Sequence, residues 1–223
     1  MPRLRDPLLM ALTGWVAVAA QAGRPLQTED AGVIEVRHCE VEGVRSRWQQ
    51  AEGGLSQSSL QLGCGLVVGT EVAFQAIDPS EFALVGKTQL VAVGDAQLTL
   101  AWTLAHRHVA AGWRRSGAGL TLAWTAPLAP HWDLHANLGH QRDEMRRSGS
   151  TVWALAAEHH GLGEDGRWQP MAEVFGDDRG QPWVNAALRF AAVPQRAFLD
   201  GSLGQRLGAG RARLVTLGFK LAW

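Results

Sequence analysis

Cys39 and Cys64 are the only two cysteines in this chain of 223 residues. They lie at nearly equal distances on either side of Ala51–Gly54, a stretch whose Gly-Gly pair is typical of a turn. If strands flank this turn, the two cysteines face each other across a hairpin. In an oxidising compartment such a pair forms a disulfide, so the spacing predicts a Cys39–Cys64 bond. Two free thiols are the alternative, because a cross-strand disulfide needs a particular geometry.

Other residues that could do chemistry form no recognisable motif. His106 and His108 share one face of an alternating segment, and His159 and His160 are adjacent, but a metal site would need further ligands at fixed geometry. The serines lie in no nucleophile elbow. We therefore expect no metal, no cofactor and no enzymatic activity. A hydrolase whose site is assembled from several strands, without a local motif, remains the alternative.

The composition excludes two broad classes of protein. Lys and Arg number 21, and so do Asp and Glu, which gives a formal charge of zero. A nucleic-acid-binding domain is normally basic, so no nucleic-acid partner is expected. Apolar residues make up 46% of the chain, which is too many for a disordered protein.

Strict alternation of apolar with small or polar residues recurs along the chain, as in Leu98–Leu104 and Val215–Trp223. A period of two predicts strands. The second face is rich in Gly, Ala, Thr, Ser, Asn and Gln, whereas a soluble sandwich or lipocalin-like barrel would place more Lys and Glu there. A transmembrane barrel turns its apolar face to lipid and its small or polar face to the lumen. Four tryptophans near strand ends fit an interfacial girdle: Trp124, Trp132, Trp168 and Trp223.

The sequence therefore predicts an all-β fold, a closed antiparallel transmembrane β-barrel of about twelve strands. Ten strands are the alternative, because the pattern in residues 70–93 does not separate clearly into individual strands. An even count places both chain ends on the periplasmic side, and the charged segments Arg107–Arg115 and Gln141–Ser150 become outward loops. The expected strands are 33–47, 55–65, 70–77, 82–93, 96–105, 116–126, 131–141, 151–160, 167–175, 183–192, 197–205 and 212–223.

The chain begins with the pattern of a cleaved signal peptide. Arg3 and Arg5 precede an apolar run from Leu8 to Ala20, and small residues frame a cleavage site after Ala22. The run is short for a membrane anchor, and no later apolar stretch is long enough for a transmembrane helix. We thus expect a signal peptide at 1–22, a periplasmic segment at 23–32 and the barrel at 33–223.

Alternation also predicts which charged and polar side chains line the lumen. Acidic residues outnumber basic ones in this set, and a ring of acidic groups favours cations in a narrow pore. The charges could instead pair across the lumen and plug it, and both interpretations stay open at this point. The expected lumen residues are Glu40, Glu42, Glu71, Lys87, Asp133, His135, Asn137, Glu158, Glu173, Arg189, Asp200 and Lys220.

Three segments come together in a family resemblance: Arg24–Ala31, Cys39–Glu42 and the terminal residues Leu217–Trp223. The stretch Arg24–Ala31 reads Arg-Pro-Leu-Gln-Thr-Glu-Asp-Ala, and its Arg-Pro-Leu-x-Thr-x-Asp-Ala pattern resembles the opening of the outer-membrane barrel family of phenol meta-degradation-pathway and transporter proteins. The terminal alternation, with Phe219, Leu221 and Trp223, resembles the signal read by the barrel-assembly machinery, although the commonest last residue there is Phe. The resemblance implies uptake of hydrocarbon or aromatic compounds.

These observations together predict a protein of the bacterial outer membrane. We expect passive transport of a small solute, aromatic or apolar in character, with outer-membrane lipid and the barrel-assembly machinery as partners. A structural or adhesive barrel with extracellular binding loops is the first alternative. A lipid-modifying barrel enzyme is the second.

Overall fold

The computed structural model describes residues 25–50, 53–78, 80–163, 165–208 and 212–223. The predicted count of twelve strands is confirmed. In the described part of the chain, no helix is long and apolar enough to cross a membrane. The strands are β1 (Cys39–Gln50), β2 (Gly53–Val67), β3 (Thr70–Ile77), β4 (Glu81–Val93), β5 (Ala96–Val109), β6 (Gly112–Ala129), β7 (Trp132–Asp143), β8 (Ser148–His159), β9 (Trp168–Asp177), β10 (Trp183–Val193), β11 (Ala197–Arg206) and β12 (Arg213–Ala222).

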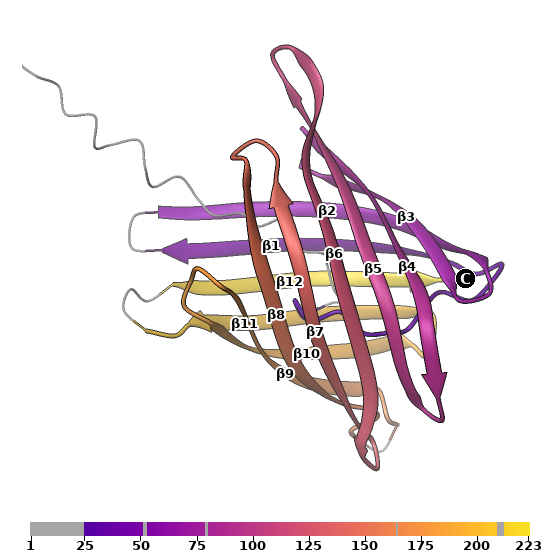
Figure 1. Cartoon of the computed structure of the whole chain (residues 1–223). Coiled ribbons are helices and arrows are strands. Elements are labelled where there is room, and N and C mark those ends of the chain that lie inside the picture. The colour runs from indigo at the N-terminus through magenta and orange to yellow at the C-terminus, as the bar shows by residue number, and fades with distance from the viewer. Residues whose placement is uncertain (1–24, 51–52, 79, 164, 209–211) are drawn as a thin grey trace, which may run out of the picture.

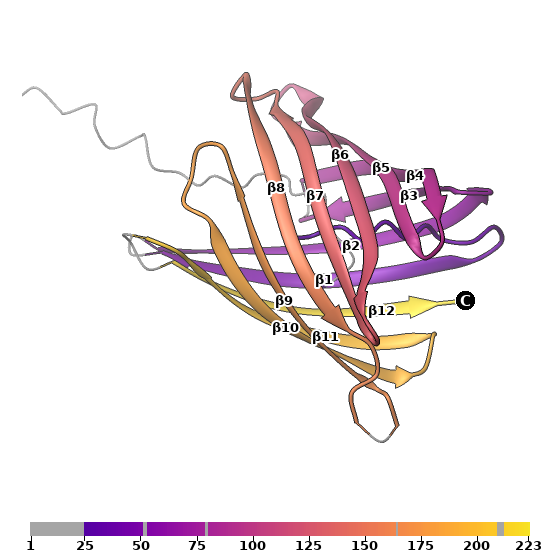
Figure 2. The ribbon, with the colours of Figure 1, turned by 60° about the horizontal axis from the view of Figure 1, so that its bottom comes forward.

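The twelve strands close into one antiparallel barrel, as Figures 1 and 2 show. Each strand pairs with its neighbours in sequence, and β1 pairs with β12 to complete the ring. The start of β1 is joined to the residue after β12 where the ring closes, because Cys39 and Trp223 exchange two backbone hydrogen bonds of 3.0 Å. A closed sheet leaves no unpaired edge, which is what a sheet in hydrocarbon requires.

The two faces of the wall differ as the alternation predicted. Large apolar side chains such as Leu120 (55% exposed), Leu138 (59%) and Leu217 (65%) point outward. Small polar side chains such as Thr99 and Thr216 are buried on the inner face. The outer surface therefore suits lipid, and the inner surface suits water or polar groups.

We call the end of the barrel at Cys39 and Trp223 the terminal end, and the opposite end the distal end. Trp132 and Trp168 are the first residues of β7 and β9, and Trp223 follows β12, so these three exposed tryptophans lie at the terminal end. This placement matches the expected aromatic girdle.

The expected outward loops are instead mostly strand. β5 continues to Val109 and β6 begins at Gly112, so Arg107–Arg115 forms a long hairpin that projects beyond its neighbours in Figure 1. Likewise β7 and β8 leave only a short turn within Gln141–Ser150. Polar side chains at these ends pair across the ladder, as in the Arg107–Glu81 and Arg115–Glu144 (2.9 Å) ion pairs, and this pairing extends the strands.

The start of the barrel also differs from the expectation. We expected a first strand at 33–47 and a periplasmic segment at 23–32, whereas β1 begins at Cys39 and residues 25–38 run inside the barrel. The cause is that backbone groups between Gln27 and Ile34 bond to lumen side chains, and only Val36 and His38 meet the backbone of β2, at Gly65. The expected signal peptide at 1–22 lies outside the described residues.

The predicted disulfide is confirmed. Cys39 and Cys64 are directly opposite each other in the β1–β2 register and are bonded, with a Cα–Cα distance of 4.1 Å. The bond fixes the first residue of β1 to β2 at the terminal end, just after the chain leaves the lumen.

Candidate functional site

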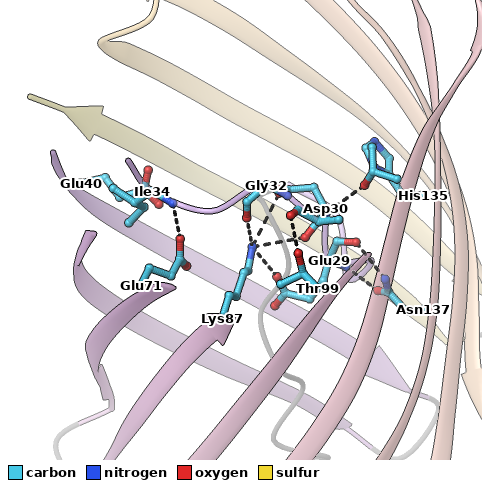
Figure 3. Close-up of polar contacts among 12 residues, drawn as sticks. Glu29, Asp30, Gly32, Ile34, Glu40, Glu71, Lys87, Thr99, His135 and Asn137 are labelled. Carbon is cyan, nitrogen blue, oxygen red and sulfur yellow. Dashed lines mark hydrogen bonds and ion pairs between the residues drawn. The ribbon is translucent and has the colours of Figure 1, made fainter. Parts of the chain in front are cut away.

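We call residues 25–38 the inner segment. This segment follows the inner face of the barrel wall. In both overall views this indigo stretch passes within the ring of strands (Figures 1 and 2). Its hydrogen bonds and ion pairs reach side chains on six strands, β9 and β7 to β3, and Figure 3 shows the central part of this path. Its hydrogen-bond and ion-pair partners on the wall are Glu173, Asn137, Thr125, Thr99, Lys87 and Glu71.

The segment is anchored at its start by Glu173 on β9. The backbone N–H of Gln27 donates to both carboxylate oxygens at 2.9 Å, and the N–H and hydroxyl of Thr28 donate to Oε2 at 2.9 and 2.7 Å. Asn185 donates to Oε1 of the same carboxylate at 2.8 Å. Next to this anchor, Leu26 packs against Ala156, Met171 and Ala187 in a small buried cluster. A buried carboxylate with this many donors is a stable attachment point.

In the middle of the segment, backbone N–H and C=O groups form hydrogen bonds with side chains of the wall, where an added strand would bond to a neighbouring backbone. Asn137 accepts the Glu29 N–H at 2.5 Å and donates to the Glu29 carbonyl at 2.8 Å. Thr125 accepts the Ala31 N–H at 2.8 Å, and Thr99 donates to the Ala31 carbonyl at 2.6 Å. The Ala31 side chain is fully buried, so there is no space for water between the segment and the wall at this point.

Lys87 on β4 is the cation that neutralises the segment. Its ammonium lies 3.0 Å from the Glu29 carboxylate and 3.7 Å from that of Asp30, and it donates to the Asp30 and Gly32 carbonyls at 3.4 Å (Figure 3). Glu29 is 4% exposed, so its charge has little access to solvent. A buried carboxylate of this kind requires a paired cation.

The far end of the segment is bound by Glu71, whose carboxylate accepts the Ile34 N–H at 2.6 Å. Four of the twelve side chains expected in the lumen thus hold the inner segment. They are Glu71, Lys87, Asn137 and Glu173.

The other expected lumen residues pair with one another or with nearby strands. Lys220 bridges Glu40 and Glu42, and Arg189 donates to Asp200 at 2.8 Å. The remaining contacts involve histidines. His135 lies 3.4 Å from Glu158, and Asp133 is 2.8 Å from His160.

The seven expected lumen carboxylates therefore do not form an open acidic ring. Each of them has a hydrogen-bond or ion-pair partner. The ion pairs of Lys220 and Arg189 join neighbouring strands, β12 with β1 and β10 with β11, so they lie along the wall and do not cross the lumen. A cation-selective ring depends on carboxylates that remain available to passing ions, and this arrangement does not provide one.

Sequence reasoning missed the residues that fill the lumen. Thr28, Glu29 and Ala31 were assigned to the periplasm, yet they are among the most buried residues described. The available signal was the motif at 24–31, which supported the family resemblance and includes Leu26, Thr28 and Ala31. Its lack of period-two alternation also separates it from a strand.

A second missed feature is an aromatic group in the distal half of the lumen. The rings of Trp48 and Trp183 meet edge to face at 5.1 Å, and Trp183 stacks with Phe175 at 6.3 Å. Trp48 lies on β1 and Trp183 on β10, which are separated by β12 and β11 in the ring, so the contact spans the interior. Their inward position follows from parity with Glu42 and Asn185, both buried.

The other predicted features can be placed plainly. Phe219, Leu221 and Trp223 are exposed on the outer face at the terminal end. Within the described residues, no group of three or more His, Cys, Asp or Glu side chains is arranged to hold a metal ion.

Comparison with solved structures identifies the fold. The KdgM porin in complex with disordered oligogalacturonate aligns with a TM-score of 0.63 at 8% identity, covering 82% of this chain and 98% of that one. An outer-membrane channel from Pseudomonas putida F1 gives 0.61 at 9% identity, covering 87% and 98%. The NanC porin gives 0.60 at 6% identity, covering 81% and 98%. No protein-family model matches the sequence, and no curated protein does.

These neighbours are porins and channels rather than enzymes, and the fold is that of outer-membrane barrels. Together with the lipid-facing exterior, they support a place in the bacterial outer membrane. They do not bear on the phenol meta-degradation resemblance, because at this identity only the fold is shared.

Proposed function

We propose that the protein is a passive outer-membrane channel for small solutes, in which the inner segment forms the constriction. The observation that carries the proposal is the docking of residues 27–34 on side chains of six strands of the lumen wall. A barrel of twelve strands is intermediate between eight-stranded barrels filled by side chains and the water-filled porins. A segment along its wall narrows the passage further.

The solute that suits the passage is small and has aromatic or apolar character. On its distal side, a solute would meet Trp48, Phe175 and Trp183 before it reached the segment. Aromatic faces bind flat or apolar molecules by stacking and by burial of area. The paired state of the lumen carboxylates supports weak charge selectivity rather than a strong preference for cations.

Conductance in planar bilayers tests the proposal. Purified protein should show small channels, and deletion of residues 25–34 should widen them several-fold while the barrel stays closed. The single substitution Glu29→Gln should have a weaker effect in the same direction, because it removes the charge that pairs with Lys87 at 3.0 Å. The matched control is Glu35→Gln, since Glu35 belongs to the same segment but its side chain is 86% exposed.

Equal conductance in the deletion variant and the parent protein would refute the constriction. Absence of conductance in both would refute the channel. Heat-modifiable migration on gels establishes in each case that the variant has formed a barrel. Uptake of an aromatic solute into vesicles, with Trp48→Ala as the variant, tests the second part of the proposal separately.

A further inference from the structure

A long groove crosses the outer face of the barrel from β7 to β12 and encloses about 830 Å³. Two rows of side chains form its walls. The row nearer the terminal end is Leu134, Ala157, Ala172, Ala186, Leu203 and Val215, and the row nearer the distal end is Leu155, Val174, Val184, Gln205, Arg213 and Gln49.

The strand register shows that this groove lies outside the lumen. Consecutive members of each row are directly paired across the ladder, as Ala172 is with Ala157 and Ala186. Between the rows runs a third line of paired residues that includes Glu173 and Asn185, whose side chains are buried on the inner face. Neighbouring positions point to opposite faces of a sheet, so the walls face outward and the backbone forms the floor.

The groove runs obliquely through the depth of the membrane. At one end lies Arg213, the first residue of β12, at the distal end of the barrel. At the other end lies Leu134, close to the start of β7 and therefore near the terminal end. The part of the groove nearer the terminal end is apolar and shallow, because three alanines form one of its walls there.

Three arginines surround the distal end of the groove on the outer face of the barrel. Arg213 is a wall residue, Arg47 is paired with the wall residue Val215, and Arg45 is paired with Leu217. All three are exposed. No ion pair joins any of them to another described residue, in contrast to Arg189 in the lumen and to Arg107 and Arg115 of the β5–β6 hairpin.

The depth of Arg213 and Arg47 corresponds to the headgroup layer of a bilayer. A tilted strand crosses the hydrocarbon in about 9–11 residues. On β12 the outward residues from Leu221 back to Val215 are apolar, and the next outward residue is Arg213. Arg213 and Arg47 therefore lie where the hydrocarbon ends, and long arginine side chains extend toward the polar layer.

We propose that this groove is a binding site for a membrane lipid with a phosphate headgroup. One acyl chain lies in the oblique groove, between the row of wall residues that contains Ala172 and the row that contains Val174. The phosphate is held by Arg47 and Arg213, with Arg45 beside them. Guanidinium groups bind phosphate oxygens through paired hydrogen bonds. Unpaired arginine charge at one end of an apolar groove is complementary to a single phosphate-bearing lipid and not to a neutral protein surface.

Native mass spectrometry of the full-length barrel released from detergent tests this site. The probe is phosphatidic acid, compared with diacylglycerol, which lacks the phosphate, and with inorganic phosphate, which lacks the chains. We expect phosphatidic acid to be retained most strongly. The double variant Arg47→Gln/Arg213→Gln should reduce this retention about 30-fold, given the usual contribution of basic residues near a membrane surface. Ala172→Phe/Ala186→Phe should fill the groove and displace both phosphatidic acid and diacylglycerol.

The matched control is Arg114→Gln on β6, an exposed arginine away from the groove. This variant should bind phosphatidic acid like the parent protein. Retention that is unchanged in the Arg47/Arg213 variant would overturn the proposal. Strong binding of inorganic phosphate alone, or no effect of filling the groove, would overturn the role of the acyl chain. A gel-shift test on heating verifies that each variant is folded, so a loss of binding is interpretable.

Discussion

At the scale of single residues, Lys87 is the cation that holds the inner segment against the lumen wall. The Lys87 ammonium and the Glu29 carboxylate are 14% and 5% exposed, and 3.0 Å apart. Removal of one partner of a buried pair leaves an uncompensated charge, which costs about 3–5 kcal/mol. Surface ion pairs of the hairpins, such as Arg115–Glu144, contribute far less.

We predict that Lys87→Met releases the inner segment from the wall while the barrel remains closed. The measurement is the reactivity of a cysteine introduced at Ala31, which is fully buried in the parent protein, in a background without the native cysteines. The double variant Lys87→Met/Glu29→Gln should recover part of the protection, because it leaves no unpaired Glu29 charge. Equal reactivity with and without Lys87 would contradict the role given to this ion pair.

The disulfide supports the segment from its other side. Reduction or Cys39→Ser/Cys64→Ser should lower stability by about 3 kcal/mol, the chain-entropy expectation for a loop of this size, since the cysteines are separated by 25 positions. Unfolding in urea measures the change. A thiol assay on purified protein should find no free thiol before reduction and two afterwards. Two thiols in the unreduced protein would show that the bond does not form.

At the scale of elements, the strands were predictable because a barrel wall imposes the same two-residue period throughout. The expected third strand, 70–77, and the observed β3 coincide, and most other boundaries shift by a few residues. The predicted start of the first strand, at residue 33, was wrong for a local reason. Val33, Ile34 and Val36 are apolar and read as strand, but Ile34 donates its N–H to the Glu71 carboxylate instead of to a ladder partner.

The site was less predictable than the strands. Parity predicts an inward position for Lys87 and Glu173, but it does not predict that both bind the same stretch of chain. Their common ligand is the backbone of residues 27–32, and its contacts join positions more than 100 residues apart, such as Thr28 and Glu173. Only the closed ring brings β4 and β9 around one segment, so no local sequence pattern could predict the site.

The outward period also makes a prediction about the strands as membrane-spanning elements. Leu138 is 59% exposed in the middle of β7, so Leu138→Arg should cost about 2–4 kcal/mol in lipid vesicles. Met145→Arg is the control, because Met145 is exposed in the β7–β8 turn beyond the strands. Urea unfolding in vesicles compares the two. A similar loss at both positions would argue against a bilayer around the middle of β7.

At the scale of the whole molecule, stability depends on ring closure between β1 and β12. Ten residue pairs from Glu40–Ala222 to Gln49–Arg213 form this seam, and the Cys39–Trp223 hydrogen bonds complete it at the terminal end. The segment that will occupy the lumen precedes β1, and the residue that completes the seam is the last in the chain. Closure therefore joins the first and last strands in chain order, and contacts of such long sequence separation slow folding.

The final residue should consequently matter more for assembly than its contact area suggests. We predict that Trp223→Ala lowers the fraction of heat-modifiable barrel in membranes of expressing cells, whereas Trp223→Phe retains it, because an exposed aromatic at this position continues the outward row of Phe219 and Leu221. Trp168→Ala is the matched control, since Trp168 is also an exposed tryptophan at the terminal end but lies outside the seam. If both alanine variants assemble equally well, interfacial anchoring alone accounts for Trp223. A selective defect at Trp223 would instead link its aromatic ring to closure of the barrel.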